Sequence, residues 1–385
     1  MKSVRIVLAA WVIACLVACG GEKEPKVAPA IPEAQNLPGK PGGKGVKVGV
    51  VLPLTGAYKV YAEEVRDGIE AALEDLGATP MRERIKLDVR DCAGDAQQAK
   101  QAYKDLVGAG AVAVIGAVDP ASTIALAEAS AAEAAAVVSP VCTAAGIESR
   151  SANFVRLAIT ENLEAAAMAR HAREQLKVQL VAIYEDATAE GQSLGRNFAK
   201  EFERQGGKVV WRETYIPEAG DYRFRLRAAK TRKPQALFVT GLMPELAEIC
   251  RQAREIGLTQ PILGGVTWDQ PTPAADLDHI YYVSQYAPGL GGPKAAALSN
   301  ILVGKRKTAN EYNALAFDAM LLVAHAVDTA EKLDAASVAK ALAASKDVPG
   351  ATGMLAAVEA NKPFYIISVA NGKKSVAKNL SLQTP

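Results

Sequence analysis

From Val46 onward, short runs rich in β-branched residues alternate with amphipathic stretches, and this alternation limits the fold more than any other feature. In the stretch after the first run, Val65, Ile69, Ala72 and Leu76 share one helical face. Strands that alternate with helices in this way are typical of parallel βαβ units. The predicted strands are VKVGVVLPL, IKLDVRD, AVAVIGAV and AVVSP, followed by VQLVAIY (178–184), KVVWRETY (208–215), QALFVTG (235–241), PILGG (261–265) and HIYYVSQY (279–286).

The alternation comes in two successive sets, which predicts an α/β protein with two doubly wound parallel sheets. A length of 385 residues also favours two domains over one. Half of the residues are apolar, which excludes a disordered, collagenous or disulfide-dense chain. Of the 44 Lys and Arg residues, Lys2 and Arg5 lie in a segment expected to be removed, which leaves 42 basic against 42 acidic residues. This balance provides no positive surplus to neutralise phosphates, so no nucleic-acid partner is expected.

The N-terminus predicts export and lipidation. A basic segment, MKSVR, precedes a run of 13 apolar residues. This run is shorter than a typical membrane-spanning helix and ends in small residues. The end of this run, Leu16-Val17-Ala18-Cys19, resembles the bacterial lipoprotein box, in which the Cys becomes the lipidated first residue. We therefore expect a signal peptide over 1–18 and lipidation at Cys19. An uncleaved anchor or a simple cut after a small residue is the alternative.

Residues 19–45 predict a flexible tether between the lipid and a globular body. After Cys19 they are rich in Pro, Gly and charge and contain almost nothing to bury. No later stretch approaches eighteen consecutive apolar residues, so no further membrane span is predicted. Cys92, Cys142 and Cys250 remain in the body and allow at most one disulfide, without indicating which pair, if any.

The loops after the predicted strands should hold any site, because ligands of open α/β sheets bind outside the carboxyl ends of the strands. These loops contain hydroxyls, acids and aromatic residues, but no nucleophile with its base. The only histidines, His171, His279 and His325, are widely spaced. No glycine-rich phosphate loop follows a strand. We therefore expect no enzyme activity, no cofactor and no metal site.

The order of four segments resembles the type I periplasmic binding proteins, and within them the Leu/Ile/Val-binding group. The segments are VKVGVVLPLTG, VIGAVDPAST, VVSPVCTAAG and TGLMPELAEICRQAREIGL, and the resemblance covers about 46–375. It implies two α/β lobes that close on a small solute and deliver it to a membrane ABC permease. Three hinge crossings are expected near 160–164, 284–288 and 361–364.

The resemblance also implies that neither lobe is contiguous: lobe one is expected over 46–162 plus 286–361, and lobe two over 163–285 plus 362–385. The protein is expected to be a monomer on the periplasmic or extracellular face of the bacterial cell envelope, held to the membrane by its lipid. The same fold also serves envelope regulatory or structural lipoproteins, such as cell-wall synthase activators, and signalling receptors. The fold alone does not separate these functions from solute capture.

The family's polar loop, Ser-Pro-x-x-Thr, matches residues 139–143. The resemblance therefore implies that the backbone of Val141, Cys142 and Thr143, with the Thr143 hydroxyl, holds the polar head of the ligand. Cys142 is either a small buried residue or a reactive thiol. Tyr61 falls where the family has a cleft tyrosine, with helix packing as the alternative.

Other positions depart from the amino-acid-binding pattern. Where the family has a serine that receives the ligand's carboxylate at a helix start, this chain has Asp119-Pro120. The negative charge of Asp119 disfavours binding of a carboxylate there. Val266 stands where the family has an ammonium-binding Glu. We predict a small polar ligand with a donor-rich end, and a branched-chain amino acid is the weaker possibility. In the alternative interpretation, Asp119 only caps its helix and Asp269 faces solvent. The remaining residues assigned to the ligand site are Ser122, Thr123, Glu190, Leu242, Trp268 and Asp269.

Overall fold

The computed structural model describes residues 45–269, 277–287, 289–357 and 363–381. The predicted signal peptide, Cys19 and nearly all of the tether lie outside these ranges, as do parts of the second and third predicted hinge crossings, at 288 and 361–362. Within the described ranges, no helix combines the length and the apolar character needed to cross a membrane. The described cysteines Cys92, Cys142 and Cys250 are buried and form no disulfide with one another.

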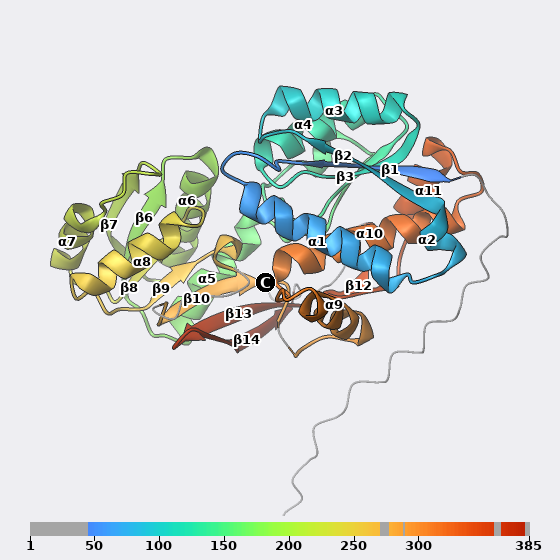
Figure 1. The fold of residues 1–385 in the computed structure, drawn as a ribbon. Helices are drawn as coiled ribbons and strands as arrows, with labels where there is room; N and C mark the ends of the chain where they lie inside the picture. Colours follow the sequence, from blue (N-terminus) through green and yellow to red (C-terminus); the bar gives the residue numbers. More distant parts are fainter. Residues whose placement is uncertain (1–44, 270–276, 288, 358–362, 382–385) are drawn as a thin grey trace, which may run out of the picture. The chain divides into compact units, whose positions relative to one another are not determined.

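The first sheet has five parallel strands in the order β2-β1-β3-β4-β5 (Figure 1). Its central strands are buried almost throughout, as expected for a parallel sheet covered on both faces. The strands are β1 (Val46–Leu52), β2 (Ile85–Asp91), β3 (Ala111–Gly116), β4 (Ala136–Ser139) and β5 (Phe154–Arg156).

Helices cover both faces of this sheet, and we call the sheet with these helices the first lobe. One apolar cluster joins it to α1 (Lys59–Asp75), α9 (Pro293–Gly304), α10 (Glu311–Thr329) and α11 (Ala335–Ala344). A second cluster joins its other face to α3 (Ala96–Gly108) and α4 (Pro120–Ser130). Because α9 to α11 come between β10 and β13, two strands of the second sheet, the first lobe is built from two separate parts of the chain. Its smaller elements are α2 (Pro80–Arg84), β11 (Val348–Gly350) and β12 (Gly353–Leu355).

The second sheet has seven strands in the order β14-β13-β10-β9-β8-β6-β7. Five of them are parallel, and the last two, β13 and β14, are antiparallel. The strands are β6 (Leu180–Asp186), β7 (Lys208–Tyr215), β8 (Ala236–Val239), β9 (Ile262–Gly264), β10 (Ile280–Ser284), β13 (Pro363–Ala370) and β14 (Lys373–Ser381). The sheet is therefore mixed, whereas the sequence predicted a parallel one.

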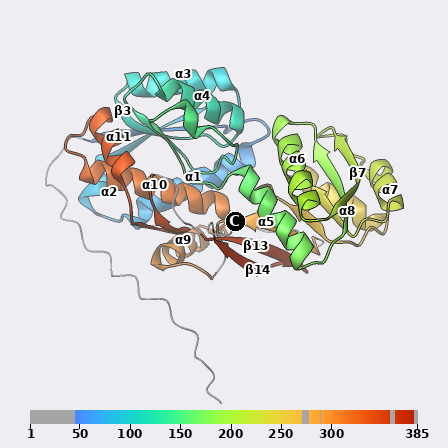
Figure 2. The ribbon, with the colours of Figure 1, turned by 180° about the vertical axis from the view of Figure 1, so that it is seen from behind.

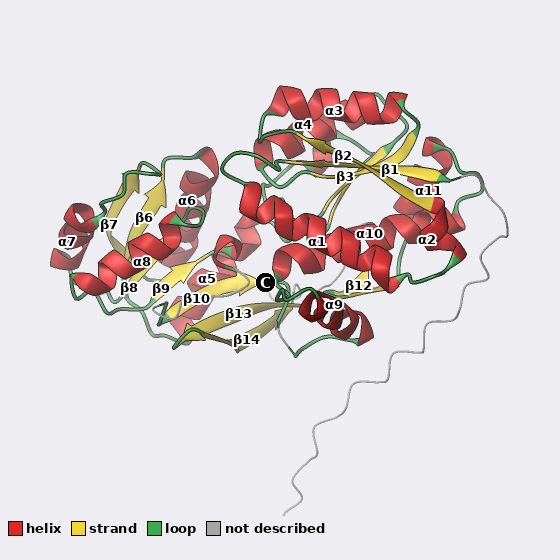
Figure 3. Ribbon diagram, in the orientation of Figure 1, coloured by secondary structure: helices red, strands yellow, loops and turns green. Residues whose placement is uncertain are grey.

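The second sheet is also covered on both faces, and with its helices it forms the second lobe. On one face it packs with α5 (Glu161–Glu174) and α6 (Ala189–Arg204), which Figure 2 shows from behind. On the other face it packs with α7 (Arg223–Thr231) and α8 (Glu245–Glu255). Figure 3 shows the strand–helix alternation of both lobes, which confirms the predicted α/β class. Each strand predicted from the sequence is present.

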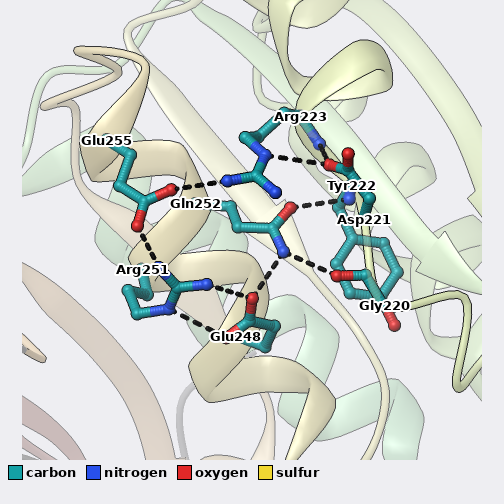
Figure 4. A network of polar contacts seen from close by, with 8 residues as sticks. All are labelled: Gly220, Asp221, Tyr222, Arg223, Glu248, Arg251, Gln252 and Glu255. Carbon is teal, nitrogen blue, oxygen red and sulfur yellow. Dashed lines mark hydrogen bonds and ion pairs between the residues drawn. The ribbon is translucent and has the colours of Figure 1, made fainter.

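A polar network joins the start of α7 to α8 (Figure 4). The buried side chain of Gln252 accepts a hydrogen bond from the Tyr222 amide (2.6 Å) and donates one to the Gly220 carbonyl (2.8 Å). Arg223 forms an ion pair with Glu255 (3.1 Å). These groups satisfy one another, so the network fixes the packing of the two helices.

Candidate functional site

A cavity lies at the carboxyl ends of both sheets, where the strand order reverses. In the first sheet the reversal falls between β1 and β3, and in the second between β6 and β8. The cavity measures about 730 Å³, including the part open to solvent. This position is typical of a small-molecule site.

The two lobes contribute different chemistry to the walls. The first lobe supplies tyrosines, apolar residues and a hydroxyl, and the second lobe supplies carboxylates, hydroxyls and glycines. The described wall consists of Tyr58, Tyr61, Val118, Pro120, Val141, Thr143, Ala144 and Tyr312 on the first side and of Glu161, Glu164, Asp186, Thr188, Glu190, Gly191, Leu194, Thr240, Gly241, Leu242, Val266 and Thr267 on the second.

Every Asp, Glu, Lys, Arg or His side chain on the described wall is an acid. Glu161, Glu164, Asp186 and Glu190 line it, and no Lys, Arg or His side chain does so within the described ranges. Burial raises the pKa of the Tyr58 hydroxyl, and the charge of Glu190 raises it further. The charge of Glu190 on the second lobe therefore reaches Tyr58 on the first lobe across the cavity.

Asp186 is held in place at the end of β6. Its Oδ1 accepts a hydrogen bond from the Thr188 hydroxyl (2.7 Å), whose oxygen in turn caps α6 by accepting the Gly191 amide (3.0 Å). A Cβ atom at Gly191 would collide with Asp186 Oδ1, so glycine leaves room for the carboxylate. Burial raises the pKa of Asp186. The carboxylate is thus desolvated and pre-positioned for a donor.

Glu164 fixes the opposite part of the second-lobe wall. It is buried on α5 and accepts a hydrogen bond from the Val266 amide (2.7 Å). A Cβ atom at Gly265 would collide with its Oε1, so the loop after β9 can approach only because residue 265 is glycine. Burial raises the pKa of Glu164 to about 8, so the carboxyl is largely protonated at neutral pH.

Glu164→Gln is expected to stabilise the protein increasingly between about pH 5 and pH 8. The wild-type carboxyl keeps its proton in the folded state up to about pH 8 but loses it near its ordinary pKa of 4.5 when unfolded. Wild-type stability therefore falls through this window by about 1.4 kcal/mol per pH unit from this group, and glutamine removes that loss. Urea unfolding at pH 5, 6, 7 and 8 measures the difference.

Glu174→Gln is the matched control, because Glu174 is exposed at the end of the same helix. Its effect on the free energy of unfolding should be small at every pH. Parallel pH curves for Glu164→Gln and the wild type would contradict the assignment of a protonated Glu164.

Five of the residues predicted from the sequence line the cavity. They are Tyr61, Val141, Thr143, Glu190 and Leu242. The other five, Ser122, Thr123, Cys142, Trp268 and Asp269, do not line it, and the structure shows what each of them does instead.

Ser122 and Thr123 serve the start of α4 and not the cavity wall. The Ser122 amide donates to Asp119 Oδ1 (2.8 Å), and the Thr123 hydroxyl donates to the Asp119 carbonyl (2.7 Å). Both residues are fully buried. Asp119 is therefore the N-cap of the helix, with Pro120 at its first position, and this cap occupies the groups that we predicted for the ligand.

Cys142 is a small buried residue and not a reactive thiol. Its side chain is only 2% exposed, and burial raises its pKa to about 11, so the thiolate is scarce at neutral pH. The two neighbours of Cys142 in the polar loop, Val141 and Thr143, do reach the cavity.

Trp268 and Asp269 are structural. The Trp268 indole donates to the Val239 carbonyl (3.1 Å) inside the second lobe. Asp269 forms a buried ion pair with Lys374 (2.6 Å) and accepts hydrogen bonds from the hydroxyls of Tyr282 and Ser284 (2.9 Å each). The prediction that Asp269 faces the ligand is corrected, because its oxygens are already taken.

Sequence reasoning missed Tyr58, Tyr312 and three of the four acids on the wall. Asp186 ends β6, two residues past the strand predicted over 178–184, so its position after a predicted strand was a usable signal. Glu161 and Glu164 lie in the first turn of α5, where acids commonly stabilise a helix start, and the sequence offered no way to separate the two roles. Within the described ranges, no three His, Cys, Asp or Glu side chains gather in a way that would hold a metal ion.

Comparisons with known proteins agree with the fold. A sequence model described as periplasmic binding protein matches residues 45–374. The chain is 25% identical over 318 residues to the Leu/Ile/Val-binding protein BraC3 of Rhizobium johnstonii, a match that covers 80% of this chain and 86% of that protein.

Solved structures share the fold. A leucine-binding protein from Thermotoga maritima matches with a TM-score of 0.79 at 25% identity, over 88% of this chain and 99% of that chain. A solute-binding protein of an ABC transporter from R. palustris, in complex with benzoate, matches with a TM-score of 0.77 at 19% identity, over 87% and 96% of the two chains. The second similarity concerns the fold alone.

Proposed function

This chain belongs to the periplasmic binding protein family, and on that premise we propose that it is a lipid-anchored protein that captures a small ligand with a cationic or amide end for an ABC importer. Members of the family bind solutes outside the cytoplasm and are not enzymes. The BraC3 relative is named for three branched-chain amino acids, and the R. palustris structure holds benzoate. The ligand of this chain is inferred from its own wall residues.

The charge of the cavity wall carries this proposal. Four carboxyl groups line the described wall, of which Glu164 is largely protonated at neutral pH, and no basic side chain there offsets the others. A carboxylate ligand such as benzoate would meet these acids without a cation to pair with. At the start of α4, Pro120 has no amide hydrogen and Asp119 takes the Ser122 amide, so this helix offers little to an anion. Amines, amides and basic amino acids fit these acceptors better than a branched-chain amino acid does.

The proposed mechanism is closure of the two lobes around the ligand. Walls from both lobes allow one ligand to contact both, and contacts made only in the closed state favour closure. We place the hinges near 160–164, 284–288 and 361–364, between lobes one and two as divided from the sequence. Acids on the second lobe would hold the cationic end, while Thr143 and Tyr58 of the first lobe hold the rest.

The experiment that tests this function is a thermal-shift screen of the purified full chain against three sets of compounds: amines, amides and basic amino acids; branched-chain amino acids; and benzoates. A compound at one hundred times its dissociation constant adds about 2.7 kcal/mol of stability. We expect the first set to give the largest shift. A larger shift with leucine or benzoate would overturn the ligand class. No shift with any set would favour an envelope regulatory role instead.

The lipid anchor is tested separately. The box that ends at Cys19 and the Pro/Gly-rich segment after it support an anchored protein. Cys19→Ala should abolish incorporation of labelled fatty acid and move the protein out of the membrane fraction. Unchanged membrane attachment of this variant would mean that no lipid holds the protein at Cys19.

A further inference from the structure

The hydroxyl of Tyr61 bridges the two lobes. Tyr61 lies on α1 of the first lobe, and its hydroxyl donates a hydrogen bond to the Thr267 carbonyl (3.2 Å). The same oxygen accepts a hydrogen bond from the Met243 amide (2.8 Å). Met243 follows β8 and Thr267 follows β9, so both partners belong to the second lobe. One side chain thus ties two separate loops of the second lobe to the first.

The ring of Tyr61 is held firmly on the first-lobe side. The side chain is 1% exposed, and its ring packs on that of Tyr312 from α10, with 4.8 Å between the ring centroids. The helices α1 and α10 both belong to the cluster that covers the first sheet. A phenol fixed in this way presents its hydroxyl in one direction with little conformational freedom left to lose.

The partners of Tyr61 in the second lobe are also fixed. Both are backbone groups, so the bonds do not depend on the side chains of Met243 or Thr267. The loop that carries Thr267 is anchored by the hydrogen bond from the Val266 amide to Glu164 (2.7 Å). The hydroxyl has one hydrogen to donate, and Thr267 takes it, so none remains for a ligand.

We propose that Tyr61 is a positioning residue that latches the two lobes together and sets how readily they close. Its role in binding rests on the proposed solute-binding function, but the latch itself does not. Without the two hydrogen bonds, conformations with the lobes apart gain population. The apparent affinity for any ligand that needs both walls then falls by the same factor as the closed population.

Hydrogen exchange of the full chain without ligand tests the latch, because the Met243 amide is one of its two bonds. Met243 lies in a turn between β8 and α8, and Tyr61 is the acceptor of its amide hydrogen. In Tyr61→Phe, exchange at Met243 should be at least about tenfold faster than in the wild type. Small-angle scattering of the same variant should show a larger radius of gyration than that of the wild type.

Tyr103→Phe is the matched control. Tyr103 is also a fully buried tyrosine, but its hydroxyl donates to the Ala135 carbonyl (2.6 Å) within the first lobe. It should leave both the exchange of Met243 and the radius of gyration unchanged. If Tyr61→Phe leaves Met243 exchange unchanged, or if both variants change it equally, the latch is refuted.

In the wild type, the Met243 amide should exchange at least about a hundredfold more slowly than an unprotected amide, although it lies outside helices and strands. Exchange at the unprotected rate would refute the latch even if Tyr61→Phe failed to fold. A latch confirmed together with a negative ligand screen would leave the latch standing and overturn solute capture, so the two failures are distinguishable.

Discussion

Replacing Lys374 by Met is expected to lower the free energy of unfolding by about 3–5 kcal/mol, the usual cost of breaking a buried ion pair from one side. The side chains of Lys374 and Asp269 are 10% and 4% exposed, and their charged atoms are 2.6 Å apart. The variant leaves the Asp269 carboxylate buried without its cation. Hydrogen bonds from the hydroxyls of Tyr282 and Ser284 and from the Glu311 amide (2.9 Å each) remain, but they supply no positive charge. Urea unfolding at pH 7 measures the loss.

Lys378→Met is the control for this change. Lys378 lies on the same strand, β14, and pairs with the exposed Glu174 at 3.5 Å, a geometry that contributes about 0–1 kcal/mol. A loss below about 1 kcal/mol for Lys374→Met would show that Asp269 is less dependent on its cation than its burial indicates. A double variant, Lys374→Met with Asp269→Asn, should recover part of the stability, because no unpaired charge remains.

Asp186→Asn is expected to weaken binding of the best amine or amide from the screen by at least about 30-fold, equivalent to about 2 kcal/mol. The asparagine is nearly the same size, so the change removes charge with little loss of volume. Burial raises the pKa of Asp186, so its ionised form opposes folding in the empty protein. The same variant should therefore stabilise the empty protein at pH 7.5, and the gain should shrink toward low pH, where the carboxyl is protonated in both states. Calorimetry and urea unfolding measure the two effects.

Asp105→Asn makes the same chemical change away from the cavity. Asp105 is exposed on α3 and accepts a hydrogen bond from Gln101 (2.8 Å). It should leave both affinity and stability nearly unchanged. Equal affinities of the wild type and Asp186→Asn for the cationic compound would show that the acids on the wall do not select the ligand.

The strands of the parallel core were predictable because β-branched, apolar runs separated by helices have few other folds open to them. The antiparallel end of the second sheet was not predicted, although the turn between β13 and β14 carries a local signal. Asn371 and Gly372 have φ angles of 51° and 67°, the left-handed values that an Asn-Gly hairpin turn requires. The family order assigned residues 362–385 to the second lobe but left their structure unspecified.

The site was predictable to the level of loops and not of single side chains. Thr143 and Glu190 follow predicted strands, and the chain brings both to the cavity. Asp269 also follows a predicted strand, but its carboxylate turns toward Lys374, 105 residues away in sequence. A contact of that separation leaves no local pattern, so an acid that binds a ligand and an acid that pairs internally are indistinguishable in the sequence.

The position of β13 beside β10 governs the order in which the protein can be completed. Residues Ile280 to Ser284 pair with residues Tyr365 to Val369, and between them the chain forms the last helices of the first lobe. All five strands of the first sheet precede residue 157, whereas the edge of β10 stays open until the last part of the chain has emerged. In a chain that is exported from its N-terminus, the unpaired edge of β10 therefore stays exposed until export is almost complete. Such an edge can pair with other chains. During that interval a periplasmic chaperone would find its most persistent target in the second lobe.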